Sequence, residues 1–516
     1  MPYAQFAATT QFFLYGTRHF NKKGYDRHVK AYKDPEALTK ADLKGKAFMV
    51  TGANSGVGKE IARFLAGKGA SVHMICRSKE RGEAARQELA QASPDADLHL
   101  WLADCGLERD VRKCWEDFSA TGSRLDGVVC NAGALLAEKT LTEEGVEVTL
   151  ASHLLFGSYL LGSLAMPALR ATQGRVIMVS SGGMYNTKFP GWDAACALEG
   201  TYDGQLAYAY MKRAQVLLAE RWADAEPAVK VVSCHPGWAD TDGVEKAYGS
   251  KKSILEPMRT PWEGAEGICW LLACPREEIQ SGAFYLDREP QVKHLAGPFF
   301  SEGSFTKNSE AEVASLMEKM ESWTTGGRPS TEALQARHAA FAAGSATRQE
   351  GRLKPLDRPI DLQRFMGQWY VISHIPTFID KNTVNGVEKY TWDEEKQLVN
   401  VEFTYMDAER TKTSSVEQTA KMVNAQNTEW KLRVKLGPLP LSLAYIIVQC
   451  AEDYSTCIVG DPGRSLLYIM ARSPSVEAGA LEELKNAAES AGYARKLIKD
   501  VPQIWDTPAP APSAGG

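Results

Sequence analysis

The sequence has little net charge, and most of its cysteines lack the close spacing of a metal-binding motif. Its 59 Lys and Arg against 64 Asp and Glu give a formal net charge of -5, which offers no electrostatic basis for nucleic-acid binding. Ten cysteines in 516 residues are too few for a disulfide scaffold. The eight from Cys76 to Cys274 show no CxxC or CxxC…HxxxH spacing. We therefore expect reduced thiols, a cytoplasmic type of compartment and no metal site.

The N-terminus lacks a basic start followed by an apolar core, so it is a poor secretory signal. Residues 1–44 are predicted to form a helical extension. The residues on its apolar face are Phe6, Phe12, Phe13 and Leu14. That face either packs on its own domain or rests on a membrane surface, which leaves a peripheral membrane contact open. The one long uncharged run, Val148–Leu169, includes a histidine, three serines and a proline, so we expect a buried helix rather than a membrane span.

Short apolar runs alternate with Ala-rich helical stretches from about residue 45 to 290. Nearly continuous apolar strands are typical of sheets covered by helices on both faces, so we expect an α/β, doubly wound parallel sheet. The expected strands include Ala47–Val50, Val72–Cys76, Gly127–Cys130, Val176–Val179, Val231–Cys234 and Phe284–Leu286. A helix over Ala311–Trp323 is expected to close this unit.

After Pro355 the pattern changes to short alternating segments with turn residues between them. This spacing predicts a small all-β barrel or sandwich. The expected strands are Trp369–Ser373, Gly386–Trp392, Leu398–Thr404, Glu429–Val434, Tyr445–Gln449, Thr456–Val459 and Leu466–Ala471. A helix over Ser475–Ala491 is expected to follow them.

These changes in composition divide the chain into five parts. The segment between the two folded domains is rich in Gly, Ala and charge and poor in large aliphatic residues, which is typical of a linker. The five parts are a helical extension (1–44), an α/β domain (45–325), a linker with a helix over Thr331–Ala342 (326–355), a β domain (356–506) and a disordered tail (507–516).

A glycine-rich turn connects the first predicted strand to a helix. Its glycines, Gly52, Gly56 and Gly58, lack the β-carbons that would keep a pyrophosphate away from the chain. The N–H groups of the helix N-terminus then bind the anion. Because the turn lies between a strand and a helix, it predicts a Rossmann-like dinucleotide site rather than a plain tight turn.

The second strand ends in Cys76-Arg77-Ser78, without the carboxylate that would accept from a ribose 2′-OH. Arg77 suits a 2′-phosphate instead, so NADP is favoured over NAD. The alternative is an exposed arginine without that role. Asp104, at the end of the third strand, is predicted to hold the adenine amine.

Tyr208 and Lys212 lie at positions i and i+4 and so share one face of a predicted helix. A phenol has an unperturbed pKa of about 10. A neighbouring ammonium favours the phenolate and lowers that pKa, which brings the hydroxyl toward the range useful for proton transfer. The pair alone is common, so its meaning depends on the motifs around it.

Five motifs follow one another: the glycine turn, Asn131-Ala-Gly, Ser180-Ser181, the Tyr208–Lys212 pair and Pro236-Gly. In this order the chain resembles the short-chain dehydrogenase/reductases over about residues 40–290. The resemblance implies that Tyr208 gives a proton to a carbonyl, that Lys212 binds the nicotinamide ribose and tunes Tyr208, and that Ser181 holds the carbonyl oxygen. It also implies a cofactor site. The site is made of Gly52, Asn54, Ser55, Gly56, Val57, Gly58, Arg77, Asp104, Asn131, Ala132, Gly133, Tyr208, Lys212, Pro236, Gly237 and Thr241.

A closer resemblance, over about residues 10–320, is to the dehydrogenase/reductase family member 12 type. It is carried by motifs such as Lys212-Arg-Ala-Gln, His235-Pro-Gly-Trp-Ala-Asp-Thr and Asp287-Arg. The long gap from Ser181 to Tyr208 resembles retinol-dehydrogenase-like members, which act on bulky apolar carbonyls. Such reductases often form dimers through helices, so the sequence leaves the oligomeric state open.

One position departs from the family pattern. Many members carry an Asn on the helix before the serine strand, where it supports a water relay to the lysine. This chain has no Asn there, and His153 stands near that place. His153 either relays protons itself or is a buried histidine satisfied by one carbonyl.

The C-terminal region carries a second set of motifs, with Gly367 and Trp369 entering the first strand and Tyr468-Ile-Met-Ala-Arg-Ser-Pro near the end. Over about residues 355–505 these resemble the lipocalins, in particular the apolipoprotein-D-like branch of bacteria and plants. The resemblance implies an eight-stranded barrel in which Arg472 packs over Trp369 and closes one end. The other end would open to an apolar cavity for a lipid or similar molecule. Alternation suggests Tyr390 and Phe403 as cavity or mouth residues.

Cys450 and Cys457 flank a predicted hairpin turn and are expected to sit opposite each other. A cross-strand disulfide requires β-carbons within about 4.5 Å. In a reducing compartment we expect two free thiols.

These observations predict an NADP-dependent carbonyl reductase or alcohol dehydrogenase that acts on an apolar, lipid-like substrate and is fused to a lipid-binding barrel. The alternative is a lipid-binding or transport protein whose reductase domain binds NADP but is weakly active. The missing helix Asn motivates this alternative.

Overall fold

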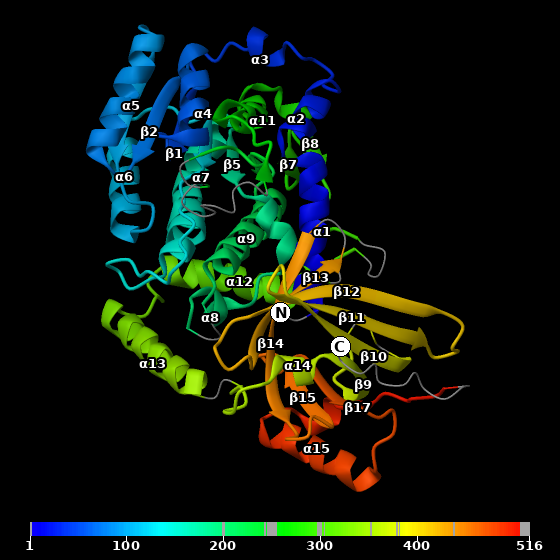
Figure 1. Cartoon of the computed structure of the whole chain (residues 1–516). Coiled ribbons are helices and arrows are strands. Elements are labelled where there is room, and N and C mark those ends of the chain that lie inside the picture. The colour runs from blue at the N-terminus through cyan, green and yellow to red at the C-terminus, as the bar shows by residue number, and fades with distance from the viewer. Residues whose placement is uncertain are drawn as a thin grey trace. The chain divides into compact units, whose positions relative to one another are not determined.

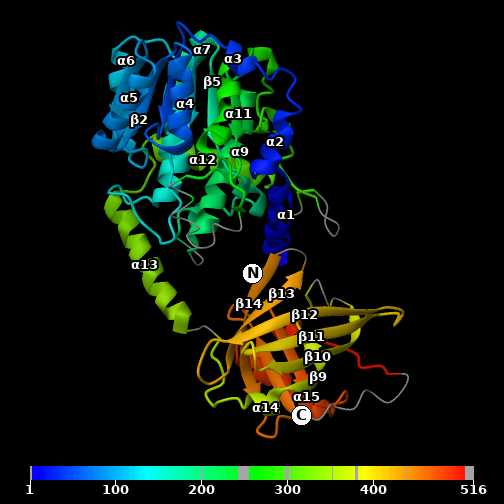
Figure 2. The same cartoon turned by 45° about the horizontal axis from the view of Figure 1, so that its top comes forward.

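The computed structural model describes residues 3–198, 202–241, 244, 255–296, 302–303, 305–350, 353–377, 380, 382–436 and 439–505. The chain forms two compact units, one of residues 7–345 and one of residues 1–6 and 346–516, which Figure 1 and Figure 2 show from two directions. Helix α13 (Thr331–Glu350) extends beyond the helix predicted for the linker. The predicted tail, 507–516, lies outside the described residues.

The first unit contains one sheet in the order β3-β2-β1-β4-β5-β6-β7-β8. Its neighbours pair in parallel from β3 to β7, and β8 pairs antiparallel with β7. The strands are β1 (Ala47–Thr51), β2 (Ser71–Cys76), β3 (Asp97–Leu102), β4 (Gly127–Cys130), β5 (Arg175–Val179), β6 (Lys230–Cys234), β7 (Phe284–Leu286) and β8 (Glu289–Gln291). The predicted α/β doubly wound sheet is confirmed, and the six strands given by range are found to within one residue at each end.

Helices cover both faces of this sheet (Figure 1). One face packs on α4 (Gly56–Gly67), α5 (Lys79–Ala92) and α11 (Pro261–Ala273). The other face packs on α6 (Glu108–Ala120), η1 (Leu150–Leu160), α7 (Leu161–Thr172), α9 (Gly204–Ala225) and α12 (Glu310–Thr324). The sheet is therefore buried on both sides, as its apolar strands require. The helix predicted over Ala311–Trp323 is confirmed as α12.

The apolar run interpreted as a buried helix is a π-helix, η1, continued by α7. A β-carbon at Gly157 would collide with the carbonyl oxygen of Ser152. Glycine, which has no β-carbon, therefore fits this wide turn of the π-helix. Leu150–Thr172 is long and apolar enough to cross a membrane, but 61% of its most apolar window is buried inside the unit. The prediction of a buried helix is confirmed.

The N-terminal extension forms α1 (Tyr3–His19), α2 (Lys22–Val29) and α3 (Ala37–Lys40). Phe12 and Phe13 of α1 pack around the Trp238 ring, with ring centroids 6.3 and 6.4 Å from it. Of the two predicted uses of this face, packing on its own domain is therefore observed. The prediction for Leu14 is wrong, because its side chain is 42% exposed. The side chain of Phe6 lies outside the described residues.

The second unit is a closed antiparallel barrel of β9 to β16, because β9 pairs with both β16 and β10. Its strands are β9 (Gly367–His374), β10 (Thr383–Asp393), β11 (Leu398–Asp407), β12 (Thr413–Met422), β13 (Glu429–Leu436), β14 (Leu439–Cys450), β15 (Thr456–Gly460) and β16 (Leu467–Ala471), with the short β17 (Lys499–Asp500) beside β9. Helix α14 (Leu362–Phe365) precedes β9, and α15 (Ala478–Ser490) packs on the outer face of β14 to β16. The predicted eight-stranded barrel with a C-terminal helix is confirmed.

Candidate active site

The glycine turn between β1 and α4 has the backbone that the prediction requires. Gly52 and Gly56 have φ angles of +66° and +52° in the left-handed region, which favours glycine. A β-carbon at Gly58 would collide with the carbonyl oxygen of Gly52. Ser55 caps the start of α4 without a side-chain hydrogen bond among the described residues, so the first-turn N–H groups stay open to a ligand. This cradle fits the pyrophosphate of a dinucleotide.

The end of β4 is tied to the cradle through Thr51. The hydroxyl of Thr51 accepts from the backbone N–H groups of Asn131 and Ala132 at 2.9 and 2.8 Å. The Asn131 amide in turn donates to the Thr51 carbonyl at 2.9 Å. A β-carbon at Gly133 would collide with the imidazole of His153. Asn131, Ala132 and Gly133 therefore line the same end of the sheet as the cradle, while Asn54 and Val57 lie in the turn itself and in the first turn of α4.

Arg77 and Asp104 come together at the ends of β2 and β3. The Arg77 guanidinium lies 3.4 Å from the Asp104 carboxylate, and the Arg77 side chain is 68% exposed. The second oxygen of Asp104 accepts from the backbone of Gly106 at 2.8 Å. An exposed guanidinium at this place is accessible to a phosphate, and the Asp104 side chain beside it is 28% exposed.

The two serines after β5 have different surroundings. The Ser180 hydroxyl is buried and donates to the backbone carbonyl of Lys212 at 2.7 Å, so it holds α9 against the sheet. Ser181 is half-buried, and its hydroxyl accepts from the Gly183 N–H at 3.1 Å. A β-carbon at Gly183 would lie 3.6 Å from the Ser181 hydroxyl oxygen and 3.7 Å from Cε1 of Tyr208. Ser181 and Tyr208 are therefore neighbours, while Ser180 is fully engaged elsewhere.

Lys212 lies one turn after Tyr208 on α9, with its ammonium 5.3 Å from the centre of the phenol ring. The ammonium donates to the Val179 carbonyl at 2.7 Å and to the Gln215 side-chain oxygen at 3.2 Å. Burial lowers the pKa of Lys212 to about 7 because an ammonium is poorly solvated inside the protein. The pair predicted from its i, i+4 spacing is thus brought together at the carboxyl ends of the strands.

Gln215 is a residue of this site to which the sequence assigned no role. Its amide donates to the His153 carbonyl at 2.8 Å and to the Ser158 hydroxyl at 3.0 Å, while its oxygen accepts from Lys212. Gln215 thereby joins the lysine to the widened turn of η1. Its position, three residues after Lys212 on the same helix face, is the signal that would have pointed to it.

The loop after β6 lies beside the cradle. Gly237 has a φ of +71°, and the loop runs through Pro236 and Gly237 to Thr241. A β-carbon at Gly56 would lie 3.1 Å from the methyl carbon of Thr241. Of the three residues that the resemblance assigned to the nicotinamide, Thr241 therefore lies against the glycine turn.

One end of the barrel is closed as the lipocalin resemblance implied. The Arg472 guanidinium lies 3.9 Å from the centre of the Trp369 ring. It also donates to a ring of backbone carbonyls, those of Arg364, Phe365, Met366 and Gln368, at 2.7 to 3.1 Å. The predicted Arg472–Trp369 contact is confirmed.

The barrel interior holds a carboxyl group beside Tyr390, one of the two side chains predicted to point inward. Tyr390 and Phe403 are both buried in the interior core. The hydroxyls of Tyr390 and Tyr445 lie 2.5 Å apart, and both donate to the Glu388 carboxylate. Burial raises the pKa of Glu388 to about 7, although these two donors oppose the shift.

Cys450 on β14 and Cys457 on β15 are directly opposite each other in the antiparallel register. Both are free thiols, as are the other eight cysteines. The predicted cross-strand position is confirmed. In the described ranges, no group of three or more His, Cys, Asp or Glu side chains is placed to hold a metal ion.

Comparisons with known proteins agree with both halves of this description. The family model described as short chain dehydrogenase matches residues 46–251, and the one described as Lipocalin-like domain matches residues 360–503. The chain is 37% identical over 312 residues to "Dehydrogenase/reductase SDR family member 12" of Bos taurus, which covers 60% of this chain and 95% of the relative. It is 32% identical over 258 residues to "Retinol dehydrogenase 12" of Homo sapiens, covering 48% of this chain and 80% of the relative. A solved "short chain dehydrogenase/reductase family protein" matches 47% of this chain and 96% of its own at 25% identity, with a TM-score of 0.37.

The bovine relative is matched almost from end to end at 37% identity. The two family models also confirm the fusion that the sequence motifs predicted. Short-chain dehydrogenases use a nicotinamide cofactor, and the glycine cradle fits such a group. The chain therefore belongs to the short-chain dehydrogenase/reductase family of oxidoreductases and carries a lipocalin-like domain in its C-terminal region.

Proposed function

We propose that the protein is an NADP-dependent oxidoreductase that interconverts an apolar, lipid-like carbonyl and its alcohol, and that its barrel binds an apolar small molecule or lipid. The observation that carries the proposal is the meeting of Ser181, Tyr208 and Lys212 beside the glycine cradle. The ten free cysteines support a reducing, cytoplasmic compartment.

The three side chains have complementary roles in this proposal. A bound nicotinamide supplies the hydride in reduction and accepts it in oxidation. Tyr208 gives its proton to the carbonyl oxygen in reduction and takes a proton from the alcohol in oxidation. Ser181 donates a hydrogen bond that orients the same oxygen. Lys212 stabilises the phenolate that Tyr208 becomes, because a positive charge nearby favours the ionised phenol.

The choice of NADP is supported by Arg77. Its guanidinium is exposed directly after β2, and residues 76–78 include no carboxylate that could bind a ribose hydroxyl. A charge-assisted hydrogen bond contributes about 1.5–3 kcal/mol, so Arg77→Gln should lower the NADPH-over-NADH ratio of kcat/KM by about tenfold or more. Lys79→Gln, which removes an exposed charge two residues further along at the start of α5, is the matched control and should leave the ratio unchanged.

The choice of an apolar substrate is supported by the relatives. The similarity to a retinol dehydrogenase points to the same class of bulky apolar carbonyl or alcohol. The lipocalin-like match supports an apolar ligand for the barrel.

The test is the rate of NADPH consumption with straight-chain aldehydes of increasing length. We expect kcat/KM to rise with chain length and Tyr208→Phe to lower kcat by about 10²–10⁴-fold. Tyr210→Phe removes a half-buried phenol from the same helix and should leave the rate unchanged. Equal rates for wild type and Tyr208→Phe would contradict the proposal and favour a lipid-binding protein with a weakly active reductase domain.

A further inference from the structure

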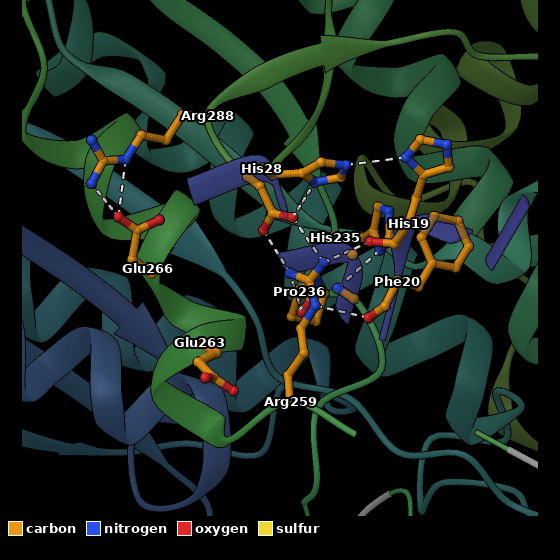
Figure 3. Close-up of polar contacts among 12 residues, drawn as sticks. His19, Phe20, His28, His235, Pro236, Arg259, Glu263, Glu266 and Arg288 are labelled. Carbon is orange, nitrogen blue, oxygen red and sulfur yellow. Dashed lines mark hydrogen bonds and ion pairs between the residues drawn. The ribbon is translucent and has the colours of Figure 1, made fainter. Parts of the chain in front are cut away.

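Arg259 lies in the middle of a buried polar cluster that joins the N-terminal helices to the loop after β6 (Figure 3). Its side chain is 0% exposed and pairs with Asp287, with nitrogen–oxygen distances of 2.5 and 2.8 Å. Burial opposes ionisation of Asp287, but Arg259 and His28 hold the pKa of its carboxyl below the usual value. The pair is therefore charged, and a buried charged pair is stable only when its remaining hydrogen-bonding groups are satisfied.

The other donors of Arg259 hold the junction between α1 and α2. Its Nε donates to the Phe20 carbonyl at 2.8 Å, and its Nη2 donates to the His19 carbonyl at 2.8 Å. These two carbonyls lie where the chain turns between the two helices. One guanidinium thus fixes this turn and Asp287 at the same time, which its planar fork of donors allows and an ammonium does not.

The same Phe20 carbonyl holds the loop after β6, because it also accepts from the Trp238 N–H at 2.8 Å. The backbone N–H of Arg259 donates to the Trp238 carbonyl at 2.8 Å. A β-carbon at Gly237 would collide with the Arg259 side chain, so the loop is wrapped closely around the guanidinium. At the end of this loop, Thr241 contacts the glycine cradle.

An apolar contact reaches the site from the same turn. The Phe20 ring is 0% exposed, and a β-carbon at Gly182 would lie 2.5 Å from its Cε2. Gly182 follows Ser181. The turn between α1 and α2 therefore touches both the loop beside the cradle and the segment that carries the proposed carbonyl-binding serine.

We propose that Arg259 is a positioning residue for the cofactor, and that the turn between α1 and α2 is part of the architecture of the cofactor site. By holding the Phe20 carbonyl, Arg259 keeps the Pro236–Thr241 loop against the glycine cradle. The inference rests on the proposed cofactor site. It goes beyond the motifs of that site, because Arg259 and Phe20 lie outside all of them.

The residue after Asp287, Arg288, provides a matched control. Arg288 forms a second buried pair, with Glu266, and both side chains are less than a tenth exposed. In the described part of the chain its hydrogen bonds go to Glu266 and to the Asp34 carbonyl, not to the loop after β6. Asp287 and Arg288 form the two-residue turn between β7 and β8, with φ angles of +51° and +69°. Two similar ion pairs therefore start from one turn, and only the Arg259 pair touches the cofactor loop.

The experiment compares Arg259→Met, Arg259→Lys and Arg288→Met in the full chain. Affinities for NADPH and NADH are measured by titrating the cofactor's fluorescence, and Tm is measured by calorimetry. We expect Arg259→Met to raise the Kd for NADPH about tenfold or more, because small displacements of a binding loop have large effects. Arg288→Met should lower Tm to a similar degree but keep the wild-type Kd. Arg259→Lys should give an intermediate Kd. Its ammonium can still pair with Asp287 but cannot also donate to the carbonyls of both Phe20 and His19.

The inference would be overturned if Arg259→Met and Arg288→Met changed the Kd equally, or if Arg259→Met lowered Tm without changing the Kd. If Arg259→Met does not fold, Arg259→Lys decides alone: a wild-type Kd contradicts the inference and a raised Kd supports it. A failure of the proposed cofactor site would be distinguishable, because wild type itself would then bind neither NADPH nor NADH.

Discussion

The imidazole of His153 stands edge-on to the phenol ring of Tyr208, with ring centroids 5.3 Å apart. Its Nε2 is 2.8 Å from the Ala134 carbonyl, and its Nδ1 has no hydrogen-bond partner among the described residues. Burial, together with the charge of Lys212, holds the pKa of His153 well below its usual value. His153 is therefore neutral near pH 7. This favours a buried histidine satisfied by one carbonyl over a proton relay.

The link between Lys212 and Gln215 predicts a change in the pH profile. The pKa of Lys212 is about 7, so its charge is present below that pH and is lost above it. We expect the kcat/KM of wild type to fall as the pH rises through about 7. Gln215→Leu removes an acceptor of the ammonium, so it should lower this pKa and move the fall to lower pH. Gln205→Leu changes an exposed glutamine on the same helix and serves as the control. An unchanged profile in Gln215→Leu would contradict this role.

The contact between Arg472 and Trp369 predicts a strong effect on the stability of the barrel. Arg472→Met removes a cation–π contact and several charge-assisted hydrogen bonds, so we expect a loss of about 3 kcal/mol or more in the free energy of unfolding. Arg472→Lys retains the charge above the ring but not the fork of donors, and should lose less. Denaturant unfolding of the full chain measures both. Equal stability of Arg472→Met and wild type would show that the contact contributes little.

Glu388 predicts a barrel that loses stability as the pH rises. Burial raises the pKa of Glu388 from the ordinary 4.5 to about 7, so the folded barrel favours the protonated carboxyl group. The stabilisation that this group gives the fold is therefore fully present below about pH 4.5 and is lost as the pH rises through about 7. Glu388→Gln cannot ionise. Above pH 7 we expect this variant to be more stable than wild type, by on the order of 3 kcal/mol. At pH 5 the two should differ little. A constant difference in Tm between pH 5 and pH 8 would be inconsistent with a buried, titrating carboxyl group.

Cys450 and Cys457 predict a disulfide that forms only under oxidation. Residues directly opposite each other in an antiparallel pair have Cα atoms about 4.5–5.5 Å apart, which a disulfide can bridge. A hydrogen bond from Cys457 and two nearby guanidinium groups lower the pKa of the Cys450 thiol, which favours the reactive thiolate. After a mild oxidant, mass spectrometry of peptides should find the two linked in wild type, with Cys450→Ser as the control. Full alkylation of both thiols after oxidation would be the opposite result.

The sequence predicted the elements whose apolar pattern is strong and missed those whose pattern is weak. Six strands of the α/β sheet were predicted by range because helices bury them on both faces. The half-exposed β3 and the short edge strand β8 were not. Strand β12 was missed because its inward positions are Val416, Gln418 and Ala420, which are small or polar. Leu14 was misplaced because its neighbours are also apolar, so the pattern did not define a single helix face.

The site shows the same division between local and distant information. Tyr208, Lys212 and the glycines were predicted because each motif is contiguous or spaced by one helical turn. Arg259 was not, because its partners Phe20 and His19 lie about 240 residues away in the chain. Gln215 is part of a recognised motif, but its role depends on the π-helical turn of η1. No local sequence pattern predicted that turn.

The most direct test of the proposed reaction is the transfer of a label. NADPH carrying deuterium at the hydride position is incubated with a long-chain aldehyde, and the alcohol is analysed by mass spectrometry. We predict that wild type places the deuterium on the former carbonyl carbon and that Tyr208→Phe forms little labelled product. Labelled alcohol in equal amounts from both proteins, or none from either, would contradict the account.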